Sequence, residues 1–490
     1  MNLNKKLAVA VSGAVLLMAG QFALADSTTD IVDALVSKGV LTEEEGKLIT
    51  KGAKSKAAAD EKAIKGKLSI SNVLESATLY GNYRARYEYR SGKSDTQEIE
   101  RQRPRGKVEM GFETATKNAY SDVALTLAGP GRSDNFSVGA DNMTDSTAQT
   151  KMAVTLKRAM FGYKVAPWLT VEAGIMKNPL YTTPMVWDAD LSVGGFAEKL
   201  TYKTDGGIEL FGNLLQHFYG PGYRTLTTTN ATGATVGTHD STLFANQIGA
   251  NIPLIADKAN GKIAATYYVY GGGYGSKGST TSLFSPGLKS SAISSTTFTQ
   301  SPAVLGTLTG MNAAVNDLDV LEIPAEVNYM VNSNHGLRVM GSYVYNFSGD
   351  DRAAAAGRYD PTNAALYAAN VDDTSWMLGV AFGSAKDLKA FAGNKFAEGD
   401  WRVSAAYQSM GAFAQDPNLN DSDIFDSRLN TEGWVLRGQY NIDDNFFVNV
   451  AYADAQRKNN NFATVTSSGN DLAINWNDFK LFQADVTYRF

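Results

Sequence analysis

Hydrophobic and polar residues alternate along most of this 490-residue chain. The pattern starts near Ser76 and continues to Phe490. It is clearest in residues 83–90, where Tyr and Ala hold the odd positions and charged residues hold every even position. Successive side chains of a β-strand point to opposite faces, so this period of two predicts strands with one apolar face and one charged face.

About sixteen such segments can be placed, and the connections between them alternate between short turns and long polar segments. The short turns include 116–119 and 443–444, and the long segments include 219–240 and 272–320. This asymmetry is typical of membrane barrels, whose strands face lipid on one side and a polar lumen on the other. Residues 71–490 are therefore predicted to form an all-β fold, a transmembrane antiparallel β-barrel. The predicted strands lie near 80–90, 101–114, 120–129, 150–165, 168–176, 194–203, 207–218, 242–252, 262–271, 321–331, 336–347, 373–383, 400–410, 431–441, 445–456 and 478–490.

The first 70 residues do not share this pattern. Lys5 and Lys6 precede an apolar run and an Ala-Leu-Ala site before Asp26, which is the layout of a secretory signal peptide at 1–25. Residues 26–70 carry apolar residues at helical spacing, which predicts a short helical segment in the periplasm. This segment is either a solvated helical hairpin or a contact element for peptidoglycan, a partner or trimer formation.

Composition fits this prediction and excludes several classes of protein. The mean hydropathy of −0.22 is expected for a barrel, because only alternate residues face lipid. The absence of cysteine removes thiol nucleophiles and Cys-ligated metals, and a net charge of −5 argues against a nucleic-acid partner. His217, His239 and His335 are not spaced as a metal pair, and no catalytic motif stands in a strand-to-helix context. No cofactor, metal site or enzymatic activity is therefore predicted.

The most specific local feature is a ladder of basic residues on the polar faces of the first two predicted strands. Its members are Arg84, Arg86, Arg90, Arg101, Arg103, Arg105 and Lys107. In an antiparallel pair they would lie side by side along the lumen. They can form an electropositive wall that biases a pore towards anions or orients an electric field. Alternatively they simply face water, paired with Glu88, Glu109 and Glu113.

Residues 178–191 form the third outer loop in this count, and this loop is less polar than the others. It holds two prolines and Trp187, together with Asp188 and Asp190. If it folds inwards it narrows the lumen and turns both aspartates towards the basic ladder. The alternative is an ordinary surface loop.

Several motifs resemble one known family. The last strand stops on Phe490, similar to the signal read by the barrel-assembly machinery of outer membranes. The opening strand at 80–90, Asn-Pro at 178–179, Val-Trp-Asp at 186–188 and Gly-Gly-Phe-Ala at 194–197 resemble a family of proteobacterial porins. A more distant similarity is to general trimeric and phosphate-selective porins.

The resemblance implies an outer-membrane porin of a Gram-negative bacterium, exported through the periplasm. It further implies passive diffusion of small polar solutes or ions through homotrimers that are surrounded by outer-membrane lipid and lipopolysaccharide. It supplies no substrate. Two other classes stay open at this point: a non-conducting structural or adhesin barrel that uses its long loops, and an outer-membrane hydrolase with a Ser/His pair at the rim.

Overall fold

A computed structural model describes most of the chain from residue 74 onwards. The segments predicted as a signal peptide, 1–25, and as a helical periplasmic segment, 26–70, lie outside the described residues. The described residues are 74–128, 133–138, 153–218, 228–229, 235–236, 242–271, 318–359, 364–384, 397–460, 465–466, 472, 474 and 476–490.

Sixteen long strands make up most of the described residues, with five two-residue strands and three short helical segments in the connections. The long strands are β1 (Ser76–Lys93), β2 (Glu98–Ala115), β3 (Ala119–Leu127), β5 (Val154–Ala166), β6 (Leu169–Lys177), β7 (Ser192–Lys203), β8 (Glu209–Phe218), β11 (Thr242–Ile255), β12 (Ala259–Gly271), β13 (Asp319–Met330), β14 (His335–Asn346), β15 (Thr374–Ser384), β16 (Trp401–Met410), β18 (Thr431–Asn441), β19 (Phe446–Arg457) and β21 (Asp478–Arg489). The short elements are β4 (Phe136–Ser137), β9 (Thr228–Thr229), β10 (Thr235–Val236), β17 (Arg428–Leu429), β20 (Val465–Thr466), α6 (Gly349–Tyr359), α7 (Ala364–Ala369) and η3 (Phe425–Ser427).

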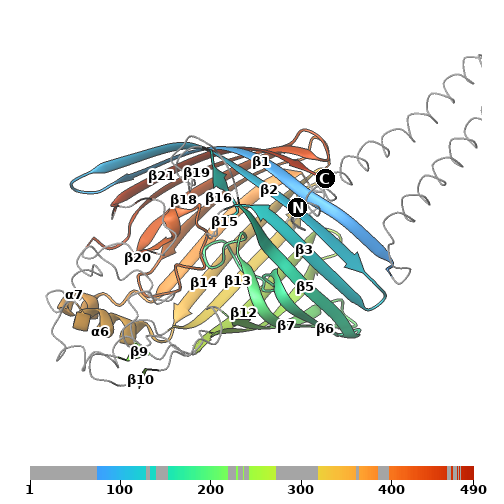
Figure 1. The fold of residues 1–490 in the computed structure, drawn as a ribbon, viewed down its shortest axis with the longest axis horizontal. Helices are drawn as coiled ribbons and strands as arrows, with labels where there is room; N and C mark the ends of the chain where they lie inside the picture. The colour runs from blue at the N-terminus through green and yellow to red at the C-terminus, as the bar shows by residue number, and fades with distance from the viewer. Residues whose placement is uncertain are drawn as a thin grey trace, which may run out of the picture. The chain divides into compact units, whose positions relative to one another are not determined.

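These long strands form one closed antiparallel barrel (Figure 1). Strands that follow each other in sequence pair all the way round, and β1 pairs with both β2 and the last strand, β21. At this seam the register runs from Asn82 opposite Arg489 to Lys93 opposite Asp478. A closed sheet has no edge strand with unpaired backbone groups, which is what a lipid environment requires. The prediction of a barrel of about 16 strands is confirmed.

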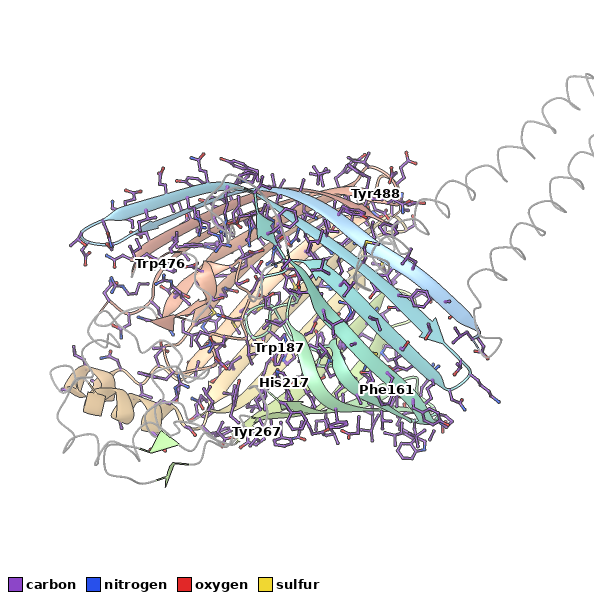
Figure 2. All side chains as sticks on the ribbon, viewed as in Figure 1. Phe161, Trp187, His217, Tyr267, Trp476 and Tyr488 are labelled. Atoms are coloured by element: carbon purple, nitrogen blue, oxygen red, sulfur yellow. The ribbon has the colours of Figure 1, made fainter. Side chains whose placement is uncertain are left out.

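The predicted alternation of faces is also present. On β1, Tyr83 and Tyr87 are 40% and 46% exposed, whereas Arg86 and Glu88 are 7% and 0% exposed. Large apolar side chains project from the outer surface all round the barrel (Figure 2). Examples are Phe112, Phe161, Tyr202, Ile248, Val339, Leu378, Trp434 and Tyr488.

Aromatic side chains gather near both ends of the strands. Near the end that carries the long connections, Trp376, Tyr407 and Trp434 pack in a row with ring centroids 5.6 Å and 5.2 Å apart. Near the end that carries the short turns, Phe382 and Trp401 pack with centroids 5.6 Å apart. Such rings occupy the two water–lipid interfaces, so the band of strand between them lies in hydrocarbon.

The helices α6 and α7 lie in the connection between β14 and β15, at the same end of the barrel as β9 and β10 (Figure 1). Among the described residues, no helix is long and apolar enough to cross a membrane.

Glycines on the inner face make room for tyrosines of the neighbouring strand. Tyr80 lies opposite Gly111 and Tyr120 lies opposite Gly162 in the register. A Cβ at either glycine would come within 2.2 Å of the facing ring. The glycine therefore lets the Tyr80 ring lie across its neighbour, where its hydroxyl donates a hydrogen bond to Asp122 at 2.5 Å.

Gly111→Val should destabilise the barrel, because the new side chain would displace the Tyr80 ring and its hydrogen bond. Overpacking of this kind costs about 1–3 kcal/mol. Urea unfolding of the refolded protein measures the change. Gly438→Val is the matched control on β18, because no atom lies within 4 Å of a Cβ placed there. Equal stability of the two variants would contradict the prediction.

Candidate functional site

The connection between β6 and β7, residues 178–191 and here called the third loop, lies inside the barrel. Trp187, labelled in Figure 2, is 4% exposed. It stacks on Tyr268 of the inner wall, with ring centroids 6.5 Å apart. The backbone N–H and carbonyl of Tyr181 bond the side chain of Gln247 at 2.9 Å and 2.8 Å. The loop is therefore held against the wall formed by β11 and β12.

A buried carboxylate on β13 anchors the same loop. Glu322 is 0% exposed. It accepts hydrogen bonds from the hydroxyl of Thr182 in the third loop at 2.9 Å, from Tyr268 at 2.7 Å and from Ser342 at 3.3 Å. A carboxylate is costly to bury unless such donors replace its water, so the loop hydroxyl and the wall depend on each other.

The connection between β16 and β18, residues 411–430 and here called the seventh loop, is also packed inside. Residues 411–420 are all buried, and Phe413 and Phe425 are 0% exposed. The alternating pattern did not predict this burial. The available signal is the presence of two phenylalanines in an acidic loop, since exposed loops rarely carry large apolar side chains.

The two loops are hydrogen-bonded to each other. The N–H of Ser422 donates to the carboxylate of Asp188 at 3.0 Å, and the N–H of Asp188 donates to the carbonyl of Leu419 at 2.5 Å. The N–H of Asp421 donates to the carbonyl of Pro184 at 2.9 Å. Asp188 therefore takes part in the junction between the loops.

The basic ladder lies on the inner faces of β1 and β2, which are adjacent. The opposite pairs in the register are Arg84 with Lys107, Arg86 with Arg105, Arg90 with Arg101, and Arg103 with Glu88. Like charges directly opposite each other repel, so a ladder of this kind requires carboxylates between its members.

Glu88 supplies the first of these carboxylates. It is 0% exposed and lies 3.1 Å from Arg90, 2.7 Å from Arg103 and 3.1 Å from Arg105. The side chain of Gln483 on β21 donates a further hydrogen bond to it at 2.9 Å. One buried carboxylate thus joins three members of the ladder.

The seventh loop brings a second carboxylate to the ladder. Asp423 lies 2.5 Å from Arg86, 3.1 Å from Arg90 and 3.5 Å from Arg105. Burial alone would raise the pKa of Asp423, but the three guanidinium groups hold it well below its usual range. From the other side, Asp485 of β21 binds Arg86 through two nitrogens at 2.7 Å and 2.8 Å. These ion pairs attach the seventh loop to the β1–β2 wall.

A β-bulge brings two neighbouring cations to the inner wall on β5. The register between β3 and β5 skips Lys157, so Lys157 and Arg158 both reach carboxylates inside the barrel. Arg158 lies 2.6 Å from Asp122 and 2.7 Å from Glu109, and Lys157 lies 3.1 Å from Glu109. This second cluster continues the ion pairs of the ladder towards the turns.

Asp190 of the third loop lies in this region. Lys107 is 3.2 Å from Asp190 and 2.7 Å from Asp134. Burial works to raise the pKa of Asp190, but Lys107, Arg84 and Lys157 together lower it to about 2. Asp190 is therefore charged at neutral and mildly acidic pH.

Arg437 and Asp421 form a more accessible ion pair, between β18 and the seventh loop. Their side chains lie 3.3 Å apart and are 43% and 19% exposed. Burial and the negative charge of Asp423 raise the pKa of Asp421. This carboxylate therefore takes up a proton more readily than its neighbours Asp423 and Asp190.

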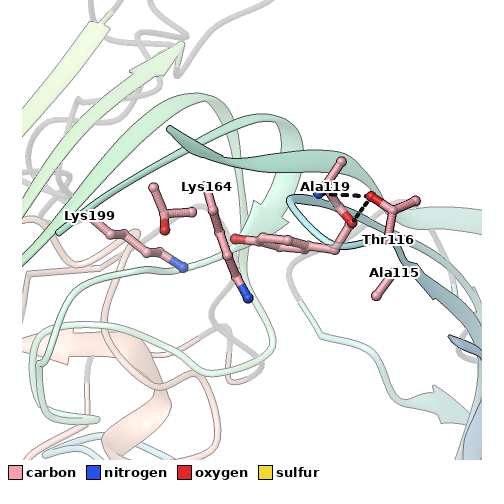
Figure 3. Close-up of a pocket in the computed structure, with 7 residues that line it drawn as sticks. Ala115, Thr116, Ala119, Lys164 and Lys199 are labelled. Atoms are coloured by element: carbon pink, nitrogen blue, oxygen red, sulfur yellow. Dashed lines mark hydrogen bonds between the residues drawn. The ribbon is translucent and has the colours of Figure 1, made fainter. Parts of the chain in front are cut away.

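A pocket of about 430 Å³ lies at the opposite end of the lumen, near the short turns (Figure 3). Lys199 lies 2.7 Å from Glu172, and the hydroxyl of Tyr120 donates to the same carboxylate at 2.5 Å. The pocket is thus another ion-paired part of the inner wall. Its lining residues are Ala115, Thr116, Ala119, Tyr120, Lys164, Thr170 and Lys199.

In the part of the chain that the structure describes, no group of three His, Cys, Asp or Glu side chains could hold a metal ion. His217 accepts a hydrogen bond from the backbone of Gly194, and His335 stacks on Phe382. His239 lies outside the described residues.

A closed barrel with an apolar outer face, a charged inner wall and two loops folded into its lumen defines an outer-membrane channel. The chain belongs to the family described as "Putative porin", which matches residues 82–475. The protein is accordingly a porin of the Gram-negative outer membrane, a channel rather than an enzyme.

Three solved outer-membrane proteins are similar to this chain at low sequence identity. OmpF of Salmonella typhi, in complex with daunomycin, aligns with a TM-score of 0.41 and 10% identity over 86% of this chain and 99% of that chain. The channel DcaP of Acinetobacter baumannii aligns with a TM-score of 0.40 and 12% identity over 86% and 99%. OprD of Pseudomonas aeruginosa aligns with a TM-score of 0.38 and 10% identity over 85% and 94%. A search of curated proteins finds no match to the sequence.

The structure brings part of the ladder together under the loops. Arg86, Arg90, Arg103 and Arg105 are at most 7% exposed. The last three contact Glu88, and Arg86 contacts Asp423 and Asp485. Arg84 and Lys107 follow towards the turns, and Arg101 lies opposite Arg90. Sequence reasoning missed several charged residues of the site, because they lie in a loop, at a bulge or on a distant strand. These are Lys157, Arg158, Asp421, Asp423 and Arg437.

Glu88→Ala should destabilise the protein strongly, because three arginines would then crowd together with one carboxylate fewer. Removing one partner of a buried ion pair costs about 3–5 kcal/mol. Urea unfolding monitored by tryptophan fluorescence measures the loss. Glu113→Ala, at an exposed position on β2, is the matched control and should change stability little. A Glu88→Ala variant as stable as this control would show that the contacts of Glu88 with the three arginines do not stabilise the protein.

Thr182→Val should loosen the third loop from Glu322, because it removes a hydroxyl donor while keeping the side chain's size. Leaving a buried acceptor short of a donor costs about 1–3 kcal/mol. Single-channel recordings should show more current noise and shorter open events than in the wild type. Thr183→Val is the matched control, since the hydroxyl of Thr183 has no hydrogen-bond partner among the described residues. Identical recordings for both variants would rule out this anchoring role.

Proposed function

We propose that this porin lets small polar solutes and ions diffuse passively, without chemical conversion, past a constriction formed by the third loop, the seventh loop and the β1–β2 wall. The lumen narrows there because both loops fill it from the side. Selectivity arises from pore width and from the electric field between the carboxylates of the loops and the cations of the wall.

The observation that carries this proposal is the pairing of loop carboxylates with wall cations. Asp423 of the seventh loop lies against Arg86, and Asp190 of the third loop lies against Lys107. At these distances the paired groups are in contact, so a solute passes beside them and meets the field of the charges that stay accessible, which low-dielectric walls strengthen. A polar solute that crosses this field can exchange its water for oriented charges.

The deeply buried and the accessible charges have different roles in this proposal. Arg86 and Arg90, which are 7% and 1% exposed, hold the seventh loop and set the field without touching solutes. Arg84 and Arg437, whose side chains are 19% and 43% exposed, are the wall cations that solutes meet. Because Arg437 is the more exposed of these two cations, we assign the anion preference of the pore to this residue.

The proposal also covers the N-terminal segments of the chain and the assembly of the barrel. Residues 1–25 act as the signal peptide, and residues 26–70 form a helical segment in the periplasm. The barrel assembles as a homotrimer in outer-membrane lipid and lipopolysaccharide. No cofactor and no nucleic acid takes part.

Single-channel conductance in a planar bilayer, with the reversal potential under a salt gradient, tests the function. The wild type should give stepwise open channels, and Arg437→Gln should shift the reversal potential towards cations. Lys480→Gln, on the exposed outer side of β21, removes the same charge outside the lumen and should leave it unchanged. Folded barrels that never conduct would refute the proposal.

The pH dependence follows from the pKa values of the loop carboxylates. A raised pKa means that Asp421 is neutralised first on acidification, while Asp423 and Asp190 keep their charge. Arg437 then lacks its partner, so the preference for anions should increase as the pH falls. At neutral pH, Asp421→Asn should already show the stronger anion preference that the wild type shows in acid. Its anion preference should also change less on acidification. A pH response unchanged by Asp421→Asn would assign the effect to another group.

A further inference from the structure

Three polar residues stand on the outer face of the barrel where apolar residues would be expected. They are Glu198 on β7, Gln216 on β8 and Asn246 on β11, here called the polar row. These strands are neighbours in the sheet. In the register, Leu214 lies between Glu198 on one side and Asn246 on the other.

The exposure of neighbouring residues establishes that the polar row faces outwards. On β7, Phe196 and Tyr202 share the face of Glu198 and are 51% and 66% exposed. The next residue, Lys199, turns the other way and binds Glu172 of the inner wall at 2.7 Å. Successive strand residues point to opposite faces, so Glu198 points away from the lumen.

The same alternation places the other two members of the row. On β8, Leu214 and Phe218 flank Gln216 and are 37% and 52% exposed. On β11, Phe244 and Ile248 flank Asn246 and are 41% and 73% exposed.

Glu198 lies within the hydrocarbon band. β7 runs from residue 192 to residue 203, so Glu198 is close to its middle. Tyr202 lies four residues further towards the turns, about 13 Å along the strand. On the other side, the rings of Phe196 and Phe218 pack edge to face with centroids 6.3 Å apart. The carboxyl group is thus placed between aromatic residues on the membrane side of the barrel.

The polar row is only partly satisfied within one copy of the chain. The amide of Gln216 donates to one oxygen of Glu198 at 2.8 Å. Within the described residues, no ion pair involves Glu198 and no hydrogen bond involves the exposed side chain of Asn246. Lipid tails offer no donor or acceptor, and ionisable side chains at this depth are accordingly rare on lipid-facing surfaces.

We propose that the face formed by β7, β8 and β11 binds a second copy of this chain in the outer membrane. The polar row contains a carboxylate that accepts hydrogen bonds and two carboxamides that both donate and accept. About a three-fold axis close to the row, the Asn246 amide of one copy can therefore donate to the Glu198 carboxylate of the next copy. The flanking apolar residues, such as Leu214 and Ile248, supply the packing around this polar contact.

This inference rests on the proposed homo-oligomer and names one of its contact faces. It does not depend on what the lumen conducts. Conductance of each variant below separates a failure of the interface from a failure of the porin function, because a barrel that leaves the oligomer still has its own lumen.

Cysteine cross-linking tests the contact directly. The chain has no cysteine, so Asn246→Cys introduces a single thiol. In outer membranes it should form a covalent dimer of this chain on oxidation or with a short bis-maleimide. Val450→Cys on β19, 41% exposed on the outer face of another part of the barrel, should stay monomeric under the same treatment. Cross-links to a different protein, or none beyond the Val450→Cys control, would overturn the proposal.

Substitution at Glu198 tests the polar contact. Glu198→Leu should lower the oligomer fraction at least tenfold in native gel electrophoresis, while heat-modifiability shows that the barrel stays folded. Glu198→Gln keeps hydrogen-bonding groups and should retain most of the oligomer. If Glu198→Leu leaves the oligomer unchanged or strengthens it, or if the wild type is monomeric, the face is a lipid surface and the inference fails.

Discussion

A strand in lipid has no water to satisfy its backbone, and this constraint determines most of what the structure contains. Closure of β1 on β21 meets it, because every long strand then has a partner on both sides. Once the sheet is closed, alternate side chains must divide between lipid and lumen. Nearly all charge of the barrel is thereby confined to one narrow interior. The dense ion pairing of the inner wall follows from this confinement, since charges packed so closely must be balanced locally.

The carboxylates that pair with the basic ladder explain why its basic residues do not form an electropositive surface. Glu88 and Asp423 each contact three arginines, and Asp485 holds Arg86 from the far side. Two of these carboxylates come from other parts of the chain. The buried arginines therefore hold the seventh loop against the β1–β2 wall as well as carrying charge. A smaller set of charged side chains stays exposed to solvent, and in it Arg437 is paired with Asp421.

The barrel and the alignment of the ladder could be predicted from sequence, because both follow from a period of two. That period assigns Arg86 and Arg105 to inner faces, and antiparallel pairing of consecutive strands brings them together. The period carries no information about loops. Asp423 meets Arg86 across 337 positions of the chain, and nothing local indicates that contact. The bulge that brings Lys157 inside breaks the alternation itself, so a strict count of odd and even positions assigns that residue to the wrong face.

The loops also form a continuous connection between opposite walls. The seventh loop is attached to β1 through Asp423 and Arg86, the two loops are attached to each other through Asp188, and the third loop is attached to β11 through Gln247. β1 and β11 lie about half a circumference apart in the strand order. The two loops therefore join opposite sides of the sixteen-stranded ring across its lumen. The segments proposed to form the constriction thus also couple distant strands of the barrel, so a change in either loop is felt on both walls.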